Sequence, residues 1–256
     1  MTYDHLNKAW KIMSKVLLGE EIGELEEYRG YLTKHLEQVL TKKSAISGKE
    51  VTLFTHNFCK DAKFICNDEI EEYNKRLRNL KLDINEIKDI DSVLQALSDE
   101  LYYCGSIITG NCNEVNKSDG ISNSVYVHES SEIYDSKYVA FSNSIRSGEF
   151  VFGTNWSGDD KFLLKGYETS MVVRCMETIR TAICSDCYYV ASVDECKDCM
   201  FSFNQIGKRN LIGNVEFPQN EYKEMKDKLI SDIRESLKSK KTIPTMVDII
   251  RDGYGR

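Results

Sequence analysis

The sequence predicts an α+β protein in which helical segments flank a central β-solenoid. Two observations carry this prediction: a six-residue repeat through the middle of the chain, and helical spacing of the apolar residues on both sides of it. We therefore expect a mainly helical N-terminal region (1–102), a β-solenoid (103–213) and a C-terminal helical cap or arm (214–256).

The first half of the N-terminal region contains two amphipathic stripes and one strand-like segment. Apolar residues from Leu6 to Leu17 share one helical face, and Gly19 follows them as a helix end signal. A second stripe runs over residues 22–39 and predicts another helix. The β-branched and aromatic residues of Val51–Phe54 instead predict a strand.

Two further helices are expected before the repeat, and two after it. Asn67 and Asp68 can cap a helix that extends through Leu80, and Asp91 can cap one whose apolar residues face inward as far as Leu101. After Pro218, helical spacing continues to about residue 240. A short helix is expected to follow Pro244.

The central repeat places two kinds of residue three positions apart. One track of every sixth residue is β-branched, and the second track is small: Val127, Ile133, Val139, Ile145 and Val151; Ser124, Ser130, Ser136 and Ser142. This hexad frame continues without an insertion for about a hundred residues, back to Thr109 and forward to Cys199. Such a period is typical of a β-solenoid, in which both tracks point inward.

The period alone does not fix the hand of the solenoid or the length of a coil. Three hexads per coil would give about six coils and a stack of roughly 25–30 Å. A solenoid also has two open ends that need caps. The flanking helical regions are natural caps, or one of them is an arm that grips a neighbour.

The composition disfavours some classes of partner and indicates a cellular compartment. The chain has 256 residues and a net charge of −7, which disfavours nucleic acid as a partner. It contains no apolar run near the ~20 residues that span a membrane, and its N-terminus lacks the apolar stretch of a signal peptide. We expect a cytoplasmic protein with reduced thiols, or a virion protein if a phage encodes it.

Four of the nine cysteines have the spacing of a zinc site. Cys184, Cys187, Cys196 and Cys199 form the pattern C-x2-C-x8-C-x2-C, which is typical of a four-thiolate zinc module. The hexad frame offers another interpretation, because cysteines on tracks three residues apart must read C-x-x-C. Each cysteine is then a small buried apolar residue. We favour this interpretation and no cofactor, and we keep zinc as the alternative.

Three other groups could carry chemistry. His56, Cys59 and Cys66 are a weaker candidate set of metal ligands. A hexapeptide-type transferase would need a general base, for which His128 or His56 is available, although His128 follows an inward position and is expected on the surface. The segment 154–160 interrupts the repeat, and its Trp156, Asp159 and Asp160 form either a ligand-contacting loop or, as we favour, a protruding turn.

The end of the repeat resembles that of a known group of sequences. Phe201-Ser-Phe-Asn, a short basic linker and the helix starting at Glu221-Tyr are similar to a group of uncharacterised Ser-, Cys- and Tyr-rich solenoid proteins of environmental microbes and large phages. The similarity covers about residues 100–235. It implies a β-solenoid fold, assigns no activity and favours a virus-associated assembly.

Together these features predict a structural or interaction protein. We expect a capped solenoid that docks into an oligomeric assembly through protein partners or self-association, of which a virion component is one concrete version. A zinc-binding module is the alternative and a transferase the least favoured hypothesis. The sequence indicates no catalytic residues, no nucleic-acid partner and no membrane.

Overall fold

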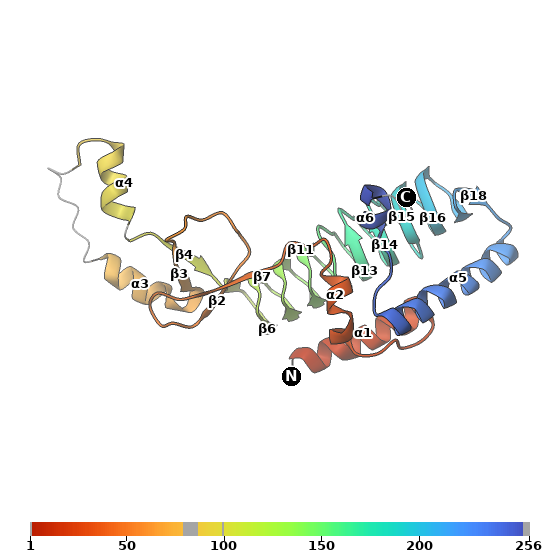
Figure 1. The fold of residues 1–256 in the computed structure, drawn as a ribbon, viewed down its shortest axis with the longest axis horizontal. Coiled ribbons are helices and arrows are strands. Elements are labelled where there is room, and N and C mark those ends of the chain that lie inside the picture. The colour runs from red at the N-terminus through yellow and green to blue at the C-terminus, as the bar shows by residue number, and fades with distance from the viewer. Residues whose placement is uncertain (1, 79–86, 99, 253–256) are drawn as a thin grey trace.

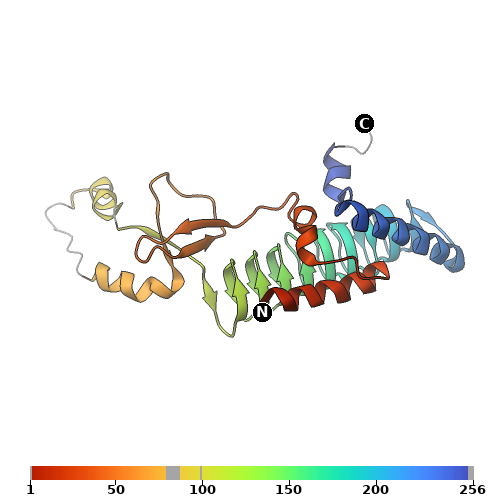
Figure 2. The ribbon, with the colours of Figure 1, turned by 60° about the horizontal axis from the view of Figure 1, so that its bottom comes forward.

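The computed structural model describes residues 2–78, 87–98 and 100–252, and it has the α+β architecture that the sequence predicts. A β-solenoid occupies the centre of an elongated molecule (Figure 1). Helices lie along one flank of the solenoid, and a segment of strands and helices, residues 40–105, projects past one end (Figure 2). We call this projecting segment the arm.

The solenoid spans residues 108–212 in about nine turns, and each turn after the first contains twelve residues. Val127 pairs with Val139 and Val139 pairs with Val151, so stacked strands are offset by two hexads. A coil therefore contains two hexads, and the estimate made for three hexads per coil does not apply. Nine turns at the inter-strand spacing give a stack of about 40 Å.

Two parallel sheets form the long sides of the solenoid. One sheet runs from β6 to β18 and the other contains β5, β7, β9 and β11. The strands are β5 Ile108–Thr109, β6 Asn113–Asn116, β7 Asp119–Ser122, β8 Val125–His128, β9 Ser131–Tyr134, β10 Lys137–Ala140, β11 Asn143–Arg146, β12 Glu149–Phe152, β13 Lys161–Tyr167, β14 Val173–Ile179, β15 Tyr188–Asp194, β16 Lys197–Ile206, β17 Arg209–Ile212 and β18 Val215–Glu216.

The corners of each coil have left-handed backbone conformation. Every third residue from Glu114 to Gly213 has a positive φ, and most of these residues are not glycine. Positive φ disfavours β-branched residues, and Ile183 is the one β-branched residue at these positions. Hydrogen bonds between coils offset the strain, for example from the Glu129 N–H to the Asn116 carbonyl at 3.1 Å.

The hexad frame is confirmed inside the solenoid, with one shift at its start. The β-branched track from Val127 to Val151 is fully buried, and so are the serines between its members. In the first turn, however, Ile108 pairs with Ile121, so Ile108 rather than Thr109 continues the inward track. The turn has one extra residue near Gly110, which has a φ of 66°.

A second core lies between the solenoid and the helices. Outward residues twelve positions apart form an apolar column on one flank: Ala140, Phe152, Leu164, Met176, Tyr188 and Met200. Helix α1 (Thr2–Leu18) covers this column with Leu6, Trp10, Met13 and Leu17, as the predicted helical face requires. It ends before Gly19, whose φ is 83°.

The second predicted stripe forms much less helix than its spacing indicates. Residues 22–39 contain only the short helices η1 (Leu25–Tyr28) and α2 (Arg29–Leu32), so the prediction of one long helix is wrong. His35 then has a φ of 65°, and the chain continues without helix towards β1. Burial of Tyr31 and Leu32 against the solenoid outweighs the local helical pattern.

The arm contains the predicted strand and both predicted helices. Strand β2 (Glu50–Leu53) pairs with β1 (Leu40–Lys43), and β3 (Lys63–Cys66) pairs with β4 (Tyr102–Gly105). A short η2 (Asn67–Glu69) leads into α3 (Ile70–Leu77), and Leu80 lies outside the described residues.

The other helix of the arm differs from its prediction in two details. Asp89 rather than Asp91 caps α4 (Ile90–Ser98), because the Ser92 N–H donates to the Asp89 carboxylate at 2.9 Å. Leu94 and Leu101 are more than half exposed, so the expected inward face of this helix is wrong. The arm thus presents apolar side chains to solvent.

Both C-terminal helices are confirmed. Helix α5 (Gln219–Lys240) begins directly after Pro218, and α6 (Met246–Asp252) follows Pro244. Helix α5 packs against α1 and β17, whereas α1 packs against β8, β10 and β12. These helices therefore cover the flank of the solenoid, and the short antiparallel strand β18 pairs with β17 at the C-terminal edge.

Candidate functional site

The four cysteines of the predicted zinc site lie inside the solenoid, in two successive coils. Cys184 and Cys196 are twelve residues apart on one inward track, and Cys187 and Cys199 are twelve apart on the other. Each thiol contacts the carbonyl oxygen two residues earlier, at 2.9 Å from Cys184 and 3.2 Å from Cys196. Each cysteine thus has a packing position and a hydrogen-bond acceptor.

The surroundings of these thiols bear on metal binding. Hydrogen bonds among the cysteines raise the pKa of Cys187 and lower the pKa values of Cys184 and Cys199, so the quartet favours the thiolate at some positions and the neutral thiol at another. The zinc site remains a prediction. Elemental analysis of the purified protein tests it, since a four-thiolate site requires one zinc per chain.

The three residues of the second predicted ligand set, His56, Cys59 and Cys66, lie in different surroundings. Cys59 is exposed and Cys66 is buried, while the His56 ring contacts the Gln38 carbonyl at 3.0 Å. Cys66 instead lies with Asp68 and Glu69, where three possible ligand atoms fall within 4.8 Å of one another. The Glu69 carboxylate already accepts hydrogen bonds from the Cys66 N–H and the Ser44 hydroxyl, both at 2.7 Å. The Glu69 carboxylate therefore stabilises the start of η2.

His128 points out of the solenoid, as predicted, but it is not a surface residue. Only 8% of it is exposed, because α1 lies over it and Tyr3 packs edge-on against its ring at 5.4 Å. Burial lowers the pKa of His128. The prediction of an exposed histidine is wrong because the flank of the solenoid is itself a core.

The segment 154–160 does not form a single loop site. Trp156 is 63% exposed and Asp159 is exposed, but Asp160 is fully buried at an inward position. The Ser157 hydroxyl donates to the Asp160 carboxylate, whose other oxygen has no partner. Burial raises the pKa of Asp160 to about 7. Asp160 is thus part of the interior of the solenoid.

A buried charge pair ties both termini to the solenoid. Lys165 and Glu177 occupy one corner column, twelve residues apart. Lys165 donates to the carbonyl of Leu32 at 3.2 Å, while Glu177 accepts from Tyr31 and from the N–H of Met246 at 2.7 Å. Burial raises the pKa of Glu177 and lowers that of Lys165. The pair positions α2 and α6, and it has almost no open space beside it.

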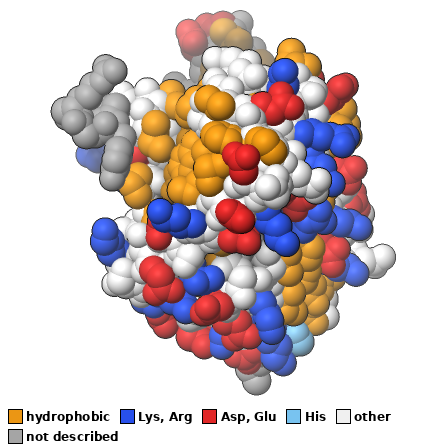
Figure 3. All heavy atoms as spheres, turned by 90° about the vertical axis from the view of Figure 1, so that its right-hand side faces the viewer, with side chains coloured by type: hydrophobic (Ala, Val, Ile, Leu, Met, Phe, Trp, Pro, Cys, Tyr) orange, Lys and Arg blue, Asp and Glu red, His pale blue; other side chains and the backbone are white. Residues whose placement is uncertain are grey.

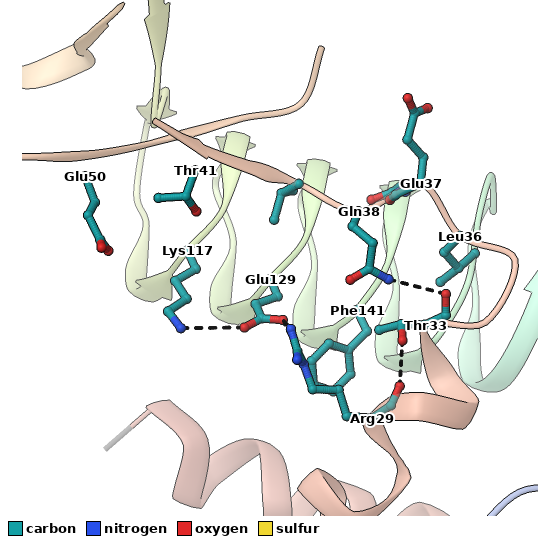
Figure 4. Close-up of a pocket in the computed structure, with 12 residues that line it drawn as sticks. Arg29, Thr33, Leu36, Glu37, Gln38, Thr41, Glu50, Lys117, Glu129 and Phe141 are labelled. Carbon is teal, nitrogen blue, oxygen red and sulfur yellow. Dashed lines mark hydrogen bonds and ion pairs between the residues drawn. The ribbon is translucent and has the colours of Figure 1, made fainter. Parts of the chain in front are cut away.

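A polar cavity of about 300 Å³ lies where α2 and the following segment cross the solenoid (Figure 4). Arg29 and Lys117 both point towards the Glu129 carboxylate, and Lys117 is 3.7 Å from it. Asn143 donates to the Glu37 carbonyl at 2.8 Å on the opposite side. Arg29, Lys117 and Glu129 pair with one another, so these contacts mainly hold the crossing segment.

An apolar groove opens on the flank between α5, α6 and the late coils. Its walls are Tyr189, Phe201, Phe203, Leu229, Ile233, Ile243, Pro244 and Ile249, with Asp232 at its rim. In the view onto the C-terminal end, hydrophobic side chains gather near the top of a surface that otherwise carries charges of both signs (Figure 3).

The two ends of the solenoid differ sharply. At the C-terminal end, β18 pairs with β17, and the inward Leu211 is 2% exposed. At the other end, the first coil (residues 106–117) ends in the edge strands β5 and β6, each with a single neighbour. The inward Ile108 is 39% exposed there, and Val115 is half-buried. The first coil is therefore partly open to solvent, with the arm at its start, where the Ser106 N–H donates to the Thr52 carbonyl at 2.8 Å.

The sequence also carries a signal for the length of the coil. Residues twelve apart at the corners carry opposite charges or aromatic rings: Lys117 and Glu129, Lys165 and Glu177, Glu168 and Arg180, Arg174 and Asp186, and the series Tyr126, Tyr138, Phe150 and Phe162. The rings of that series stack at about 5 Å. This pattern predicts a coil of twelve residues.

No family model, curated protein or solved structure matches the chain. Among the described residues, no helix combines the length and the apolar character needed to cross a membrane. The function is therefore inferred from the geometry of the chain itself.

Proposed function

We propose that the protein is a structural or interaction protein whose solenoid docks into an oligomeric assembly through its first coil. The observation that supports this proposal is the difference between the two ends. At the C-terminal end the short antiparallel strand β18 pairs with β17, whereas no strand lies beyond β5 and β6 among the described residues. Open edges recruit other chains, and proteins normally cover, shorten or charge them.

The polar groups elsewhere in the described structure support the same conclusion. Lys165, Glu177 and Asp160 have shifted pKa values, which would mark a catalytic cluster in an open cleft. Here each of them lies inside the fold and contacts neighbouring segments. Their contacts join the terminal helices and the coils, as in a scaffold.

Light scattering after size-exclusion chromatography tests the proposal. We expect a mass above the 29.4 kDa of a single chain, or a stable complex with a protein encoded beside it. A component of a virion, the most concrete version, would also be found in purified particles. A protein that stays monomeric and forms no complex in its native source would contradict the proposal.

A further inference from the structure

The apolar groove between α5, α6 and the late coils is an unfilled part of the second core. Elsewhere on the same flank, Trp10 of α1 fills the space over the solenoid and packs edge-on against Phe152, with their rings 5.6 Å apart. In the groove, the Tyr189 and Phe201 rings stack at 5.1 Å on the floor, and about 410 Å³ of space remains beside them. This volume lies in the range of small-molecule pockets in proteins.

The walls of the groove offer few polar groups to a ligand. Of its ten lining residues, eight are apolar or aromatic, and the other two, Asp232 and Ser236, lie one turn apart on α5. The Tyr189 hydroxyl already donates to the Pro244 carbonyl at 2.7 Å. A bound peptide would bring one N–H and one C=O per residue into this space, and the walls could not satisfy them. The groove therefore suits a compact ligand with an apolar body and few polar groups.

Asp232 gives the rim of the groove a negative charge. Other acidic residues of this flank are paired within the chain. Asp198 pairs with Lys226 at 2.8 Å. Asp248 pairs with Lys34 at 2.7 Å. Asp232 is exposed, and none of the described lysines, arginines and histidines forms an ion pair with it. A ligand can therefore supply the cation that complements this carboxylate.

We propose that the groove binds a small cationic amphiphile, which is a ligand with an apolar body and a single amine head. The body lies on the Tyr189 and Phe201 rings, and the ammonium group pairs with the Asp232 carboxylate. Burial of the body supplies most of the affinity, and the ion pair at the exposed rim favours the cation over neutral and anionic ligands. The groove lies at the late coils, so its binding is independent of docking through the first coil.

Isothermal titration calorimetry at pH 7 with three matched probes tests the proposal. The probes 4-phenylbutylamine, 4-phenylbutanol and 4-phenylbutyrate share one apolar body and carry a positive, a neutral or a negative head. We expect the amine to bind about fivefold more tightly than the alcohol, and the carboxylate to bind most weakly. Equal affinities for the amine and the alcohol, or no binding of the amine, would overturn the proposal and leave the docking function standing.

Two substitutions on α5 locate the ion pair. Asp232→Asn keeps the shape of the side chain and removes its charge, so the amine should then bind no more tightly than the alcohol. Asp227→Asn removes an exposed charge of the same helix outside the groove, and the preference of about fivefold should remain. A preference that survives in Asp232→Asn, or that is lost in Asp227→Asn, would assign the ion pair to another site and overturn the proposal.

Discussion

The serine half of the solenoid (residues 118–154) and the cysteine half (residues 172–199) share the same hexad repeat. They differ in the small inward side chain, which ends in a hydroxyl in the first half and in a thiol in the second. In the serine half, Ser130 donates to the His128 carbonyl at 2.8 Å and accepts from the Ser142 N–H at 3.1 Å. In the cysteine half, Cys196 donates to the Asp194 carbonyl at 3.2 Å. Both side chains bond to the carbonyl two residues earlier, at the same point of the coil.

The difference teaches what the frame requires of its small track. It requires a small side chain with a hydrogen that can reach the carbonyl oxygen at the corner. Serine adds a strong acceptor for the next coil, whereas sulfur accepts weakly and adds apolar volume. The C-x-x-C pairs can therefore arise from packing, without a selected metal site.

The large inward residues should contribute equally in both halves. Val139→Ala and Val190→Ala make the same change at two fully buried sites, one in each half. We expect each to lower the free energy of unfolding by about 3 kcal/mol, from lost burial and the cavity that remains. Urea denaturation measures both losses in the free energy of unfolding. If one loss is less than about half of the other, the two halves are not equivalent.

The boundary between the halves should respond to pH through Asp160. Burial raises its pKa from 3.8 to about 7, so the folded state holds a proton that the unfolded chain releases. Stability should therefore fall as the pH rises from about 4 to about 7 and stay low above it. Asp160→Asn removes this dependence.

The variant should be more stable than the parent protein by about 4 kcal/mol at pH 8, with a much smaller difference at pH 4. Thermal unfolding across this range measures the effect. Parallel pH profiles for the two proteins would contradict the assignment. Asp159→Asn, at the neighbouring exposed residue, serves as the control.

The smallest effects should separate the two chemistries of the small track. Ser130→Ala leaves the buried Ser142 N–H without its acceptor and should cost about 1.5 kcal/mol. Cys196→Ser keeps the bond to the Asp194 carbonyl and loses only apolar volume, so it should cost less than about 1 kcal/mol. If Cys196→Ser is the more damaging change and also removes bound zinc, the metal interpretation of the quartet gains support.

Local patterns in the sequence predicted most of the architecture. The alternation of β-branched and small residues determined which side chains face inward, because only those fit the narrow interior. Pro218 and the apolar spacing after it predicted α5 closely. The first helix could likewise be read from its apolar face and from Gly19. Each of these features depends on residues that are near one another in the chain.

Other features depended on contacts that are distant in the chain. The stripe over residues 22–39 stays short because its tyrosines and Leu32 pack on the solenoid. His128 is buried because α1, more than a hundred residues earlier, covers it. The candidate interface was missed for the same reason, since the openness of β5 and β6 is visible only once the other strands are placed.

The sequence by itself determined the inward tracks and the positions of the main helices, because backbone geometry repeats locally and selects residue size at each position. Only the tertiary structure decided the second core on the flank and the open first coil. These features depend on which segments lie next to one another, and the free energy of that choice comes from burial summed over distant segments.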